Sequence, residues 1–526
     1  MLKKILCLSL SCLFLFGGCK GTSEPQQQAE GSTSADTEEV TFETEAEQAN
    51  YYDSNFPPLE EVQAMYPDKT ILVWVIEPVS NDAAFQYRTK EVNEYLDSMG
   101  YDFAVSFRAI EPERMQEPPF TMKTTYMQEV EEAVKNGEQL DIIHSSFSVS
   151  GEPGCKSYHK YIYNGLFEPL DEYFKTELGQ KLYDIMPEKH WSGLRVNGSI
   201  YGVDGMMTSV NFSCGYYYNT ELLKKYSDFD VARPLSEQID VLKEIKENEK
   251  CCIVGSFSDY LGCGEIFTQM HNVTDAVYWD DDAGTARCVL DNDKYTAALK
   301  AFYDLRKEGL ISNYSASDTN FFACLTFAPG GCLTKCFDFN CNGNVFSVTP
   351  VFSGGAWITQ SFNATGICTA SKHKEMAFQL LALVQTDPYL NNLLTYGLEG
   401  TDYKLVEGIP DTIHTAMNQN RFANKMICYP TGLDTYAFDS AEALRSVVSA
   451  AAVSESLDFA FDGRGTEEAT KKTNAIIDEI GTAIFSDEYA DFDALLAAFR
   501  ERLDEAGIQE IIDQCNKQYE AWRKSE

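Results

Sequence analysis

The chain has 526 residues, 44% of them hydrophobic, which is enough for two or three domains with sizeable cores. Its formal net charge is −39, from 81 acidic against 42 basic side chains. This charge argues against nucleic acids and anionic lipid headgroups as partners, because both are bound through Lys and Arg. It does not identify a ligand, since an acidic surface mainly contributes solubility.

Residues 1–18 have the pattern of a secretory signal peptide. Lys3 and Lys4 precede the apolar run 5–16, which two glycines and Cys19 follow. The run is too short to span a bilayer as a mature helix, which needs about 20 apolar residues. A cysteine after two small residues resembles the lipobox of bacterial lipoproteins, in which the cysteine sulfur carries a diacylglyceryl group. The resemblance implies cleavage before Cys19 and lipidation of its sulfur; an ordinary signal peptide is the alternative.

Residues 19–65 are predicted to form a disordered tether. Between Lys20 and Asn50 the chain consists mainly of Gln, Glu, Ser, Thr, Ala and Gly, and its only large apolar side chains are Val40 and Phe42. Such a segment cannot bury enough apolar surface to offset its ordering entropy. We expect it to hold a folded body away from the membrane, with lipid on Cys19 as the anchor.

Strands and helices alternate in the next part of the chain. Apolar runs and periodicity predict strands at 71–76, 101–110 and 140–143 and helices at 86–99 and 122–136. This order predicts parallel α/β layering, in which ligands bind beyond the carboxyl ends of the strands. Glu77, Ser145 and Ser146 follow two of these strands and are therefore candidate polar contacts for a ligand.

Five motifs further along the chain carry a family resemblance. They are GLFEPLDEYF at 165–174, NGSIYGV at 197–203, YYNTELLKKY at 217–226, GICTASKHKEMA at 366–377 and NLLTYGLEGTDY at 392–403. Together they resemble the extracellular solute-binding proteins of ABC importers, the family that includes maltose-binding protein. The last motif resembles a large lipoprotein subgroup thought to handle oligosaccharides. The resemblance extends from about residue 66 to the end of the chain.

The resemblance implies a type II periplasmic-binding-protein-like α/β fold, in which a hinge of crossing segments joins two lobes that hold solute between them. The implied lobes are 66–208 with 356–402 for lobe 1, and 209–355 with 403–526 for lobe 2. Gly-bearing loops between periodic segments predict the crossings at 202–213, 349–355 and 400–408. Helical periodicity predicts a helical C-terminal extension with helices at 441–454, 467–484, 490–507 and 508–524.

A sugar site needs aromatic rings for the apolar sugar faces and polar side chains for the hydroxyl edges. Trp357 follows the second predicted crossing, and Trp279 precedes an acidic turn. Tyr436 and Phe438 resemble the position at which carbohydrate-binding relatives place an aromatic ring against the sugar. Asp204 stands where the family often has proline. The predicted solute-binding residues are Glu77, Ser145, Ser146, Asp204, Trp279, Trp357, Tyr436 and Phe438.

Enzyme and metal signatures are missing from the sequence. It contains no GxSxG, HExxH, Walker A or GxGxxG motif. Asp280, Asp281 and Asp282 lack the alternating ligands of a calcium loop and are better explained as a solvated turn. The sixteen cysteines lack zinc-site spacing and are better explained as reduced, buried small hydrophobes. We therefore expect no catalytic residue, no metal and no cofactor.

The predicted protein is a monomeric receptor, exported and anchored by lipid to the outer face of the cell membrane. It captures a small solute, expected to be an oligosaccharide, and delivers it to the subunits of an ABC permease. Solute favours the closed form of the two lobes by its differential affinity for that form. The alternatives are a lipid-anchored glycoside hydrolase and a binding or sensor protein that is not coupled to transport. Acidic sugars, polyols and peptides remain alternative solutes.

Overall fold

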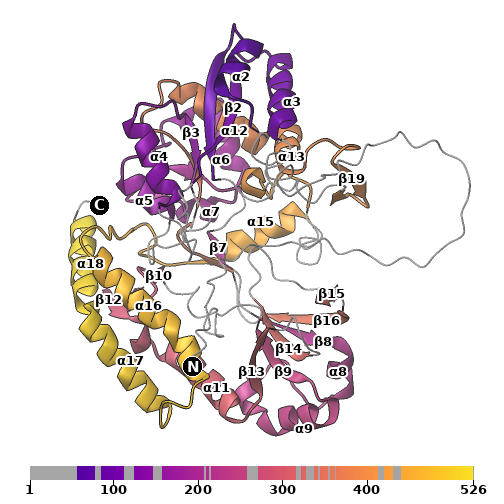
Figure 1. Cartoon of the computed structure of the whole chain (residues 1–526), viewed down its shortest axis with the longest axis vertical. Helices are drawn as coiled ribbons and strands as arrows, with labels where there is room; N and C mark the ends of the chain where they lie inside the picture. The colour runs from indigo at the N-terminus through magenta and orange to yellow at the C-terminus, as the bar shows by residue number, and fades with distance from the viewer. Residues whose placement is uncertain are drawn as a thin grey trace, which may run out of the picture.

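The computed structural model describes residues 56–77, 85–111, 124–145, 157–205, 209–211, 215–256, 271–315, 321–326, 337–341, 344–352, 356–361, 363–412, 420–430 and 440–524. These residues form two bodies, one above the other in Figure 1, with a layer of helices along one side. The predictions for Cys19, Ser146, Tyr436 and Phe438, and for the tether up to residue 55, lie outside the described residues.

Lobe 1 is built on a five-stranded sheet in the order β2-β1-β3-β18-β6. Its strands are β1 (Thr70–Ile76), β2 (Phe103–Ala109), β3 (Ile142–His144), β6 (Gly202–Val203) and β18 (Thr365–Ile367). β1 pairs in parallel with β2 and β3, whereas β18 is antiparallel to both β3 and β6. The continuous apolar run of β1 is buried along nearly its whole length, as expected for a strand covered on both faces. The carboxyl ends of β1 and β3 therefore lie at one edge of lobe 1.

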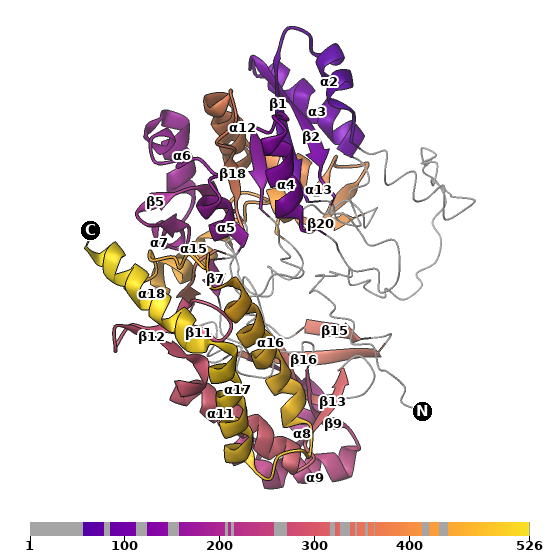
Figure 2. The same ribbon diagram turned by 60° about the vertical axis from the view of Figure 1, so that its left-hand side comes forward.

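Helices cover this sheet on both faces (Figures 1 and 2). They are α2 (Leu59–Met65), α3 (Phe85–Ser98), α4 (Tyr126–Lys135), α5 (Ser157–Tyr163), α6 (Glu177–Ile185), α7 (Glu188–Ser192), α12 (Lys374–Thr386) and α13 (Pro388–Tyr396). A further helix, α15 (Ala441–Ala450), lies at the lower end of lobe 1, near the hinge strand β7, residues Val210–Asn211 (Figure 1). The helix starts follow local chemistry: Thr125 and Gln128 form a capping box on α4, and the Asp387 side chain caps α13 ahead of Pro388. One continuous hydrophobic core joins these helices to the sheet.

Lobe 2 contains a six-stranded mixed sheet in the order β13-β9-β14-β8-β16-β15. Its strands are β8 (Gly215–Asn219), β9 (Cys252–Ser256), β13 (Ile311–Ser315), β14 (Phe321–Thr326), β15 (Phe337–Cys341) and β16 (Asn344–Phe352). Helices α8 (Thr220–Lys225), α9 (Ile239–Glu249) and α11 (Asp293–Lys307) lie beside it (Figure 1). A second core centres on Tyr218, Leu242 and Phe322.

The C-terminal extension is a separate layer with its own core. It comprises the antiparallel strands β10 (His271–Asn272), β11 (Val277–Asp280) and β12 (Thr285–Cys288) and the helices α16 (Glu467–Ile484), α17 (Phe492–Ala506) and α18 (Ile508–Arg523). Gly507, at a φ of 94°, makes the left-handed turn between α17 and α18. In Figures 1 and 2 the extension spans the height between the lobes, and the C-terminus lies beside lobe 1. The predicted helical extension is therefore confirmed for α16, α17 and α18, whereas the helix predicted at 441–454 packs on lobe 1.

Three short strands cross between the lobes and pair in the order β21-β17-β7. They are β7 (Val210–Asn211), β17 (Trp357–Ile358) and β21 (Ala452–Val453). β17 is antiparallel to β7 and parallel to β21. β7 lies inside the first predicted crossing, and β17 begins just after the second. This small sheet is the described part of the hinge.

The third crossing lies later in the chain than the sequence predicts. Residues 400–408 belong instead to a hairpin of β19 (Tyr403–Val406) and β20 (Ile409–Thr412), whose turn includes Gly408 at a φ of 83°. The described residues after this hairpin still pack on lobe 1, because Phe422 and, on the apolar face of α15, Leu444 and Val448 belong to the first core. The predicted boundary of lobe 1 at residue 402 is therefore too early. A Gly-bearing loop alone does not distinguish a hairpin turn from a crossing.

Candidate functional site

Ser145 directly follows β3 and is fully buried at the carboxyl end of the lobe 1 sheet. Its backbone N–H donates to the carbonyl oxygen of Ala364 at 2.9 Å, and its hydroxyl accepts from the N–H of Ala364 at 2.9 Å. The neighbouring His144 Nδ1 lies 2.9 Å from Thr365 Oγ1. Ser145 is therefore at the predicted edge of the sheet, where it joins the end of β3 to the start of β18.

Asp204 follows β6 at the same edge and is 5% exposed. One of its carboxylate oxygens lies 3.2 Å from Ser361 Oγ, which also lies 2.7 Å from the carbonyl oxygen of Asn363. The single proton of the Ser361 hydroxyl serves one of these acceptors at a time. The carboxylate thus meets the segment that links β17 in the hinge to β18 in the sheet.

Arg421 is a component of this edge that the sequence reasoning missed. It lies in the short 3-10 helix η5 (Asn420–Phe422), and its Nη1 donates to the carbonyl oxygen of Glu77 at 2.6 Å, just beyond β1. Burial lowers the pKa of His144 to about 3, and the positive charge of Arg421 adds to this shift. The guanidinium therefore lies close to the ends of both β1 and β3. A single arginine in a loop has no periodicity or spacing that would have revealed it.

Glu77 affects the pKa of a buried hydroxyl, that of Tyr126, at the same edge of the sheet. Burial raises the pKa of the Tyr126 hydroxyl well above its usual value, Glu77 raises it further, and Arg421 opposes the shift. The Tyr126 hydroxyl itself donates to the carbonyl oxygen of His144 at 3.1 Å. Opposite charges thus act on the same buried hydroxyl at this edge of the sheet. We call Glu77, Ser145, Asp204 and Arg421 the strand-end site.

The two tryptophans proposed as sugar platforms lie in different places. Trp357 is half-buried on β17, paired with Asn211 and Ala452 of the neighbouring hinge strands. Trp279 on β11 is 3% exposed, and its ring stacks on Tyr519 at a centroid distance of 3.8 Å. The structure therefore places Trp357 at the hinge and Trp279 inside the core of the C-terminal extension. A tryptophan beside an acidic turn has the same sequence pattern whether its ring faces a ligand or is buried in a core.

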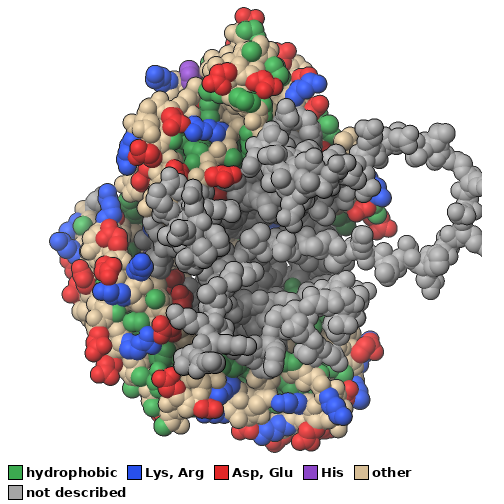
Figure 3. Space-filling model, in the orientation of Figure 1, with side chains coloured by type: hydrophobic (Ala, Val, Ile, Leu, Met, Phe, Trp, Pro, Cys, Tyr) green, Lys and Arg blue, Asp and Glu red, His purple; other side chains and the backbone are tan. Residues whose placement is uncertain are grey.

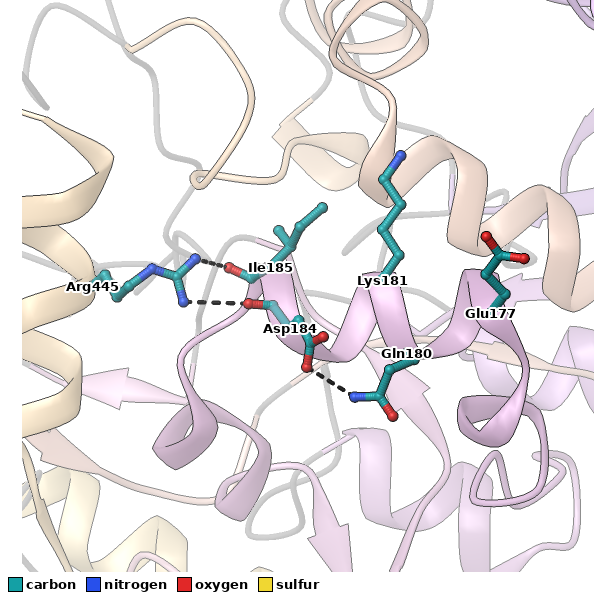
Figure 4. A pocket seen from close by; sticks show the side chains of 6 residues that line it. All are labelled: Glu177, Gln180, Lys181, Asp184, Ile185 and Arg445. Atoms are coloured by element: carbon teal, nitrogen blue, oxygen red, sulfur yellow. Dashed lines mark hydrogen bonds between the residues drawn. The ribbon is translucent and has the colours of Figure 1, made fainter.

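A surface groove on lobe 1 lies between α6 and α15 (Figure 4). Arg445 donates to the carbonyl oxygens of Asp184 and Ile185 at the end of α6, and Gln180 Nε2 donates to Asp184 Oδ1 at 2.8 Å. The arginine thus satisfies carbonyl groups that a helix leaves without internal partners. Among the side chains that line the groove, Arg445 caps α6 and Gln180 pairs with Asp184, and the polar groups do not converge on a common point (Figure 4).

Asp281 forms hydrogen bonds with two serine side chains of the described residues. Its two carboxylate oxygens accept from the hydroxyls of Ser454 at 2.5 Å and Ser456 at 2.6 Å. His271 Nδ1 lies 2.7 Å from Ser456 Oγ. The acidic turn therefore fastens the segment after β21 to the C-terminal extension.

The described residues contain neither a cluster of metal ligands nor a membrane-spanning helix. Within them, no three His, Cys, Asp or Glu side chains come together as metal ligands. In the same residues, no helix combines the length and hydrophobicity needed to cross a membrane. In the view of Figure 3, acidic and basic side chains are interspersed over the described surface of both lobes.

Two α/β lobes, a hinge of paired crossing strands and polar groups at one sheet edge define the type II solute-binding-protein fold. The crystal structure of the N-glycan transport solute binding protein NgtS from Streptococcus pneumoniae matches with a TM-score of 0.63 and 17% identity, over 87% of this chain and 99% of that one. An extracellular solute-binding protein from Bifidobacterium longum subsp. infantis matches with a TM-score of 0.51 and 13% identity, over 86% and 98%. The predicted fold class is confirmed.

Sequence comparison leads to the same class of protein. The chain is 25% identical over 419 residues to a carbohydrate ABC transporter substrate-binding protein from Streptococcus pneumoniae serotype 4, covering 74% of this chain and 82% of the relative. Residues 455–524, in the C-terminal extension, match a domain family of unknown function, DUF3502. The predicted resemblance to the solute-binding proteins of ABC transporters is confirmed.

Proposed function

We propose that the protein is a lipid-anchored extracellular receptor that captures an oligosaccharide between its two lobes and delivers it to an ABC permease. The observation that carries the proposal is the strand-end site, where the Arg421 guanidinium and the Asp204 carboxylate lie at the carboxyl ends of open-sheet strands. The curated relative is named as a carbohydrate-binding subunit of such a transporter. NgtS has been solved in complex with Man1GlcNAc, which supports an oligosaccharide as solute here.

Capture follows from the geometry of the hinge. Each described crossing strand has only two residues, so the lobes can reorient by dihedral changes in a few positions. Solute that touches both lobes binds the closed form better and shifts the population toward it. Glu77 supplies polar contacts in this proposal and Trp357 supplies a ring at the hinge. The buried side chains of Ser145 and Asp204 hold the neighbouring chain segments in place instead. Ser146, Tyr436 and Phe438 remain predicted contacts outside the described residues, whereas the buried Trp279 is left out.

A screen of glycans tests the proposal directly. The panel contains maltotriose, mannotriose, Man5GlcNAc and trigalacturonate, and the readout is the melting temperature followed by calorimetry. Ligand at 100 times its Kd adds about 2.7 kcal/mol to the stability of the folded state. We expect at least one neutral glycan to raise the melting temperature in a saturable way. If no glycan in an extended panel binds the folded protein, the oligosaccharide proposal is wrong.

The same proposal holds that the protein is not an enzyme. The relatives are substrate-binding proteins, which supports this view over a glycoside hydrolase. Repurified protein incubated with a glycan that it binds should release no sugar. Steady turnover that survives repurification and is absent from a mock preparation would favour the hydrolase. Copurification with permease subunits from membranes separates a transport receptor from a sensor.

The lipid anchor is tested at Cys19. Cys19→Ala removes the sulfur that would carry lipid. We expect the variant to move from the membrane fraction to the soluble fraction, or to keep its signal peptide. Cys12→Ala, a change within the predicted signal peptide, serves as the control and should be processed normally. Membrane retention of fully processed Cys19→Ala would contradict lipidation.

A further inference from the structure

We propose that Arg421 orients the solute in the strand-end site. Three buried amide side chains hold the loop that carries Arg421 in position. This inference rests on the proposed function and adds to it a specificity: neutral, hydroxyl-rich sugars in preference to uronic acids. The three amides, Gln385, Asn391 and Asn424, are called the amide cluster.

The amide cluster fixes the loop at Phe422 and Asn424. Asn391 Nδ2 and Gln385 Nε2 both donate to the carbonyl oxygen of Phe422, at 2.8 and 3.0 Å. The backbone N–H of Asn424 donates to Asn391 Oδ1 at 3.0 Å, and Asn424 Nδ2 donates to the carbonyl oxygen of Gln385 at 2.7 Å. Asn391 and Asn424 are fully buried. Gln385 Oε1 is buried without a hydrogen-bond partner among the described residues, but the four hydrogen bonds above still restrict the loop to one backbone conformation.

The ring of Phe422 adds an apolar anchor next to Arg421. It packs edge-on against Trp74, at 5.3 Å and 70° between ring planes, and against Phe107, at 5.7 Å and 78°. Both partners belong to the paired strands β1 and β2. Because Phe422 is locked to the sheet, its neighbour Arg421 is held at the end of β1, where it donates to Glu77.

The same loop packs against the start of the first crossing. The N–H of Lys425 donates to the carbonyl oxygen of Gly205 at 3.0 Å. A Cβ at position 205 would lie 2.3 Å from Gln385 Oε1 and 2.4 Å from the carbonyl oxygen of Ala423, so only glycine fits there. The loop that carries Arg421 therefore touches both the strand ends and the chain entering the hinge.

The charges around Arg421 favour a neutral solute. A guanidinium offers several donors in a fixed planar fork, which suits the paired hydroxyls of a sugar ring. The Asp204 carboxylate lies at the same sheet edge, and Glu77 raises the pKa of the nearby Tyr126 hydroxyl, so both acidic side chains contribute negative potential to this edge. This negative potential makes an added carboxylate unfavourable, since like charges repel. The site thus matches a neutral oligosaccharide better than an acidic one.

The test compares two arginines that both donate to main-chain carbonyls. Arg421→Met is measured beside Arg445→Met, whose side chain lies in the groove between α6 and α15. With the panel glycan that binds the parent best, we expect calorimetry to show roughly 30-fold weaker binding for Arg421→Met. Arg421→Lys should recover part of the loss, and Arg445→Met should bind like the parent. Trigalacturonate should bind the parent more weakly than the neutral glycan.

The role of the amide cluster is tested by a double-variant cycle. Asn391→Asp keeps the shape of the side chain but removes both donations from Nδ2, to Phe422 and Val384. If the cluster acts through Arg421, Asn391→Asp should weaken binding in the parent and have no further effect on affinity in Arg421→Met. Equal effects in both backgrounds would overturn the role of the cluster.

The outcomes separate this inference from the proposed function. Parent protein that binds a glycan, together with a folded Arg421→Met that binds it equally well, overturns the inference and leaves the proposed function standing. Parent protein that binds no glycan overturns the proposed function and the inference with it. Stronger binding of trigalacturonate than of every neutral glycan overturns the preference for neutral sugars.

Discussion

Burial shifts the pKa values of titratable side chains in opposite directions in lobe 1 and in the C-terminal extension. In lobe 1, burial keeps His144 and His190 neutral and lowers the pKa of each to about 3. In the extension, burial raises the pKa of Asp275 to about 6, and the nearby Asp478 raises it further. Asn474 Nδ2 donates to Asp275 at 2.8 Å, linking α16 to the turn between β10 and β11.

The difference has a direct consequence for stability. A buried neutral histidine binds a proton more readily in the unfolded chain, so lobe 1 loses stability as the pH falls below about 6.5. A buried aspartate with a raised pKa binds a proton more readily in the folded chain. The contribution of Asp275 is therefore present below about 4 and lost as the pH rises through about 6. Mild acid should loosen one region and strengthen the other.

The largest expected effect is in the core of the extension. Trp279→Ala removes a ring that is 3% exposed and stacked on Tyr519, which should cost about 3–5 kcal/mol of stability. Hydrogen exchange should show lost protection in α16, α17 and α18 while lobe 1 is unchanged. Glycan affinity should also stay unchanged in whatever fraction remains folded. A folded Trp279→Ala that has lost only its glycan affinity would restore Trp279 to the binding site.

The acid sensitivity of lobe 1 is the next effect. His190 Nδ1 lies 2.9 Å from Ser209 Oγ, just before the hinge strand β7. Between pH 6.5 and pH 5 each buried neutral histidine should reduce stability by about 2 kcal/mol. Hydrogen exchange, corrected for the intrinsic effect of pH, should show this loss in lobe 1. His190→Gln should show a smaller loss, and an undiminished loss would rule His190 out as a source.

The opposite effect in the extension is expected to be of similar size. At pH 7.5, Asp275→Asn removes a buried charge and should stabilise α16 against exchange by about 3 kcal/mol. Near pH 4 the variant and the parent should agree, because Asp275 is then protonated when folded. Asp282→Asn, at an exposed position, should change little at either pH. A variant that is less stable than its parent at pH 7.5 would show that Asp275 is stabilising as a carboxylate.

The elements of the fold could be predicted from the sequence where burial of apolar side chains along one element determines the local pattern. The apolar run of β1 and the helical periodicity of α16 stand out locally, because each reflects burial along a regular element. The third crossing could not be recognised from the sequence, because its strand β21 consists of two exposed residues, Ala452 and Val453, and has no apolar pattern. Pairing with Trp357 and Ile358 defines it, and that contact is far away in the sequence.

The candidate site could be predicted only in part, for a related reason. Glu77 and Ser145 follow predicted strands, so the rule on strand ends finds them. Asp204 is predicted instead from its place inside the first predicted crossing, where the family often has proline. Arg421 comes to the same edge from a loop that the amide cluster holds in place. Its position depends on hydrogen bonds from α12 and α13, and no local pattern around residue 421 encodes them.

The central claim is that a sugar is captured between two lobes that close on it. Small-angle X-ray scattering of the mature protein, with and without a saturating panel glycan, measures this most directly. We expect the radius of gyration to fall with a glycan that binds by calorimetry and to stay constant with one that does not. A glycan that binds tightly and leaves the radius of gyration unchanged would contradict capture by closure.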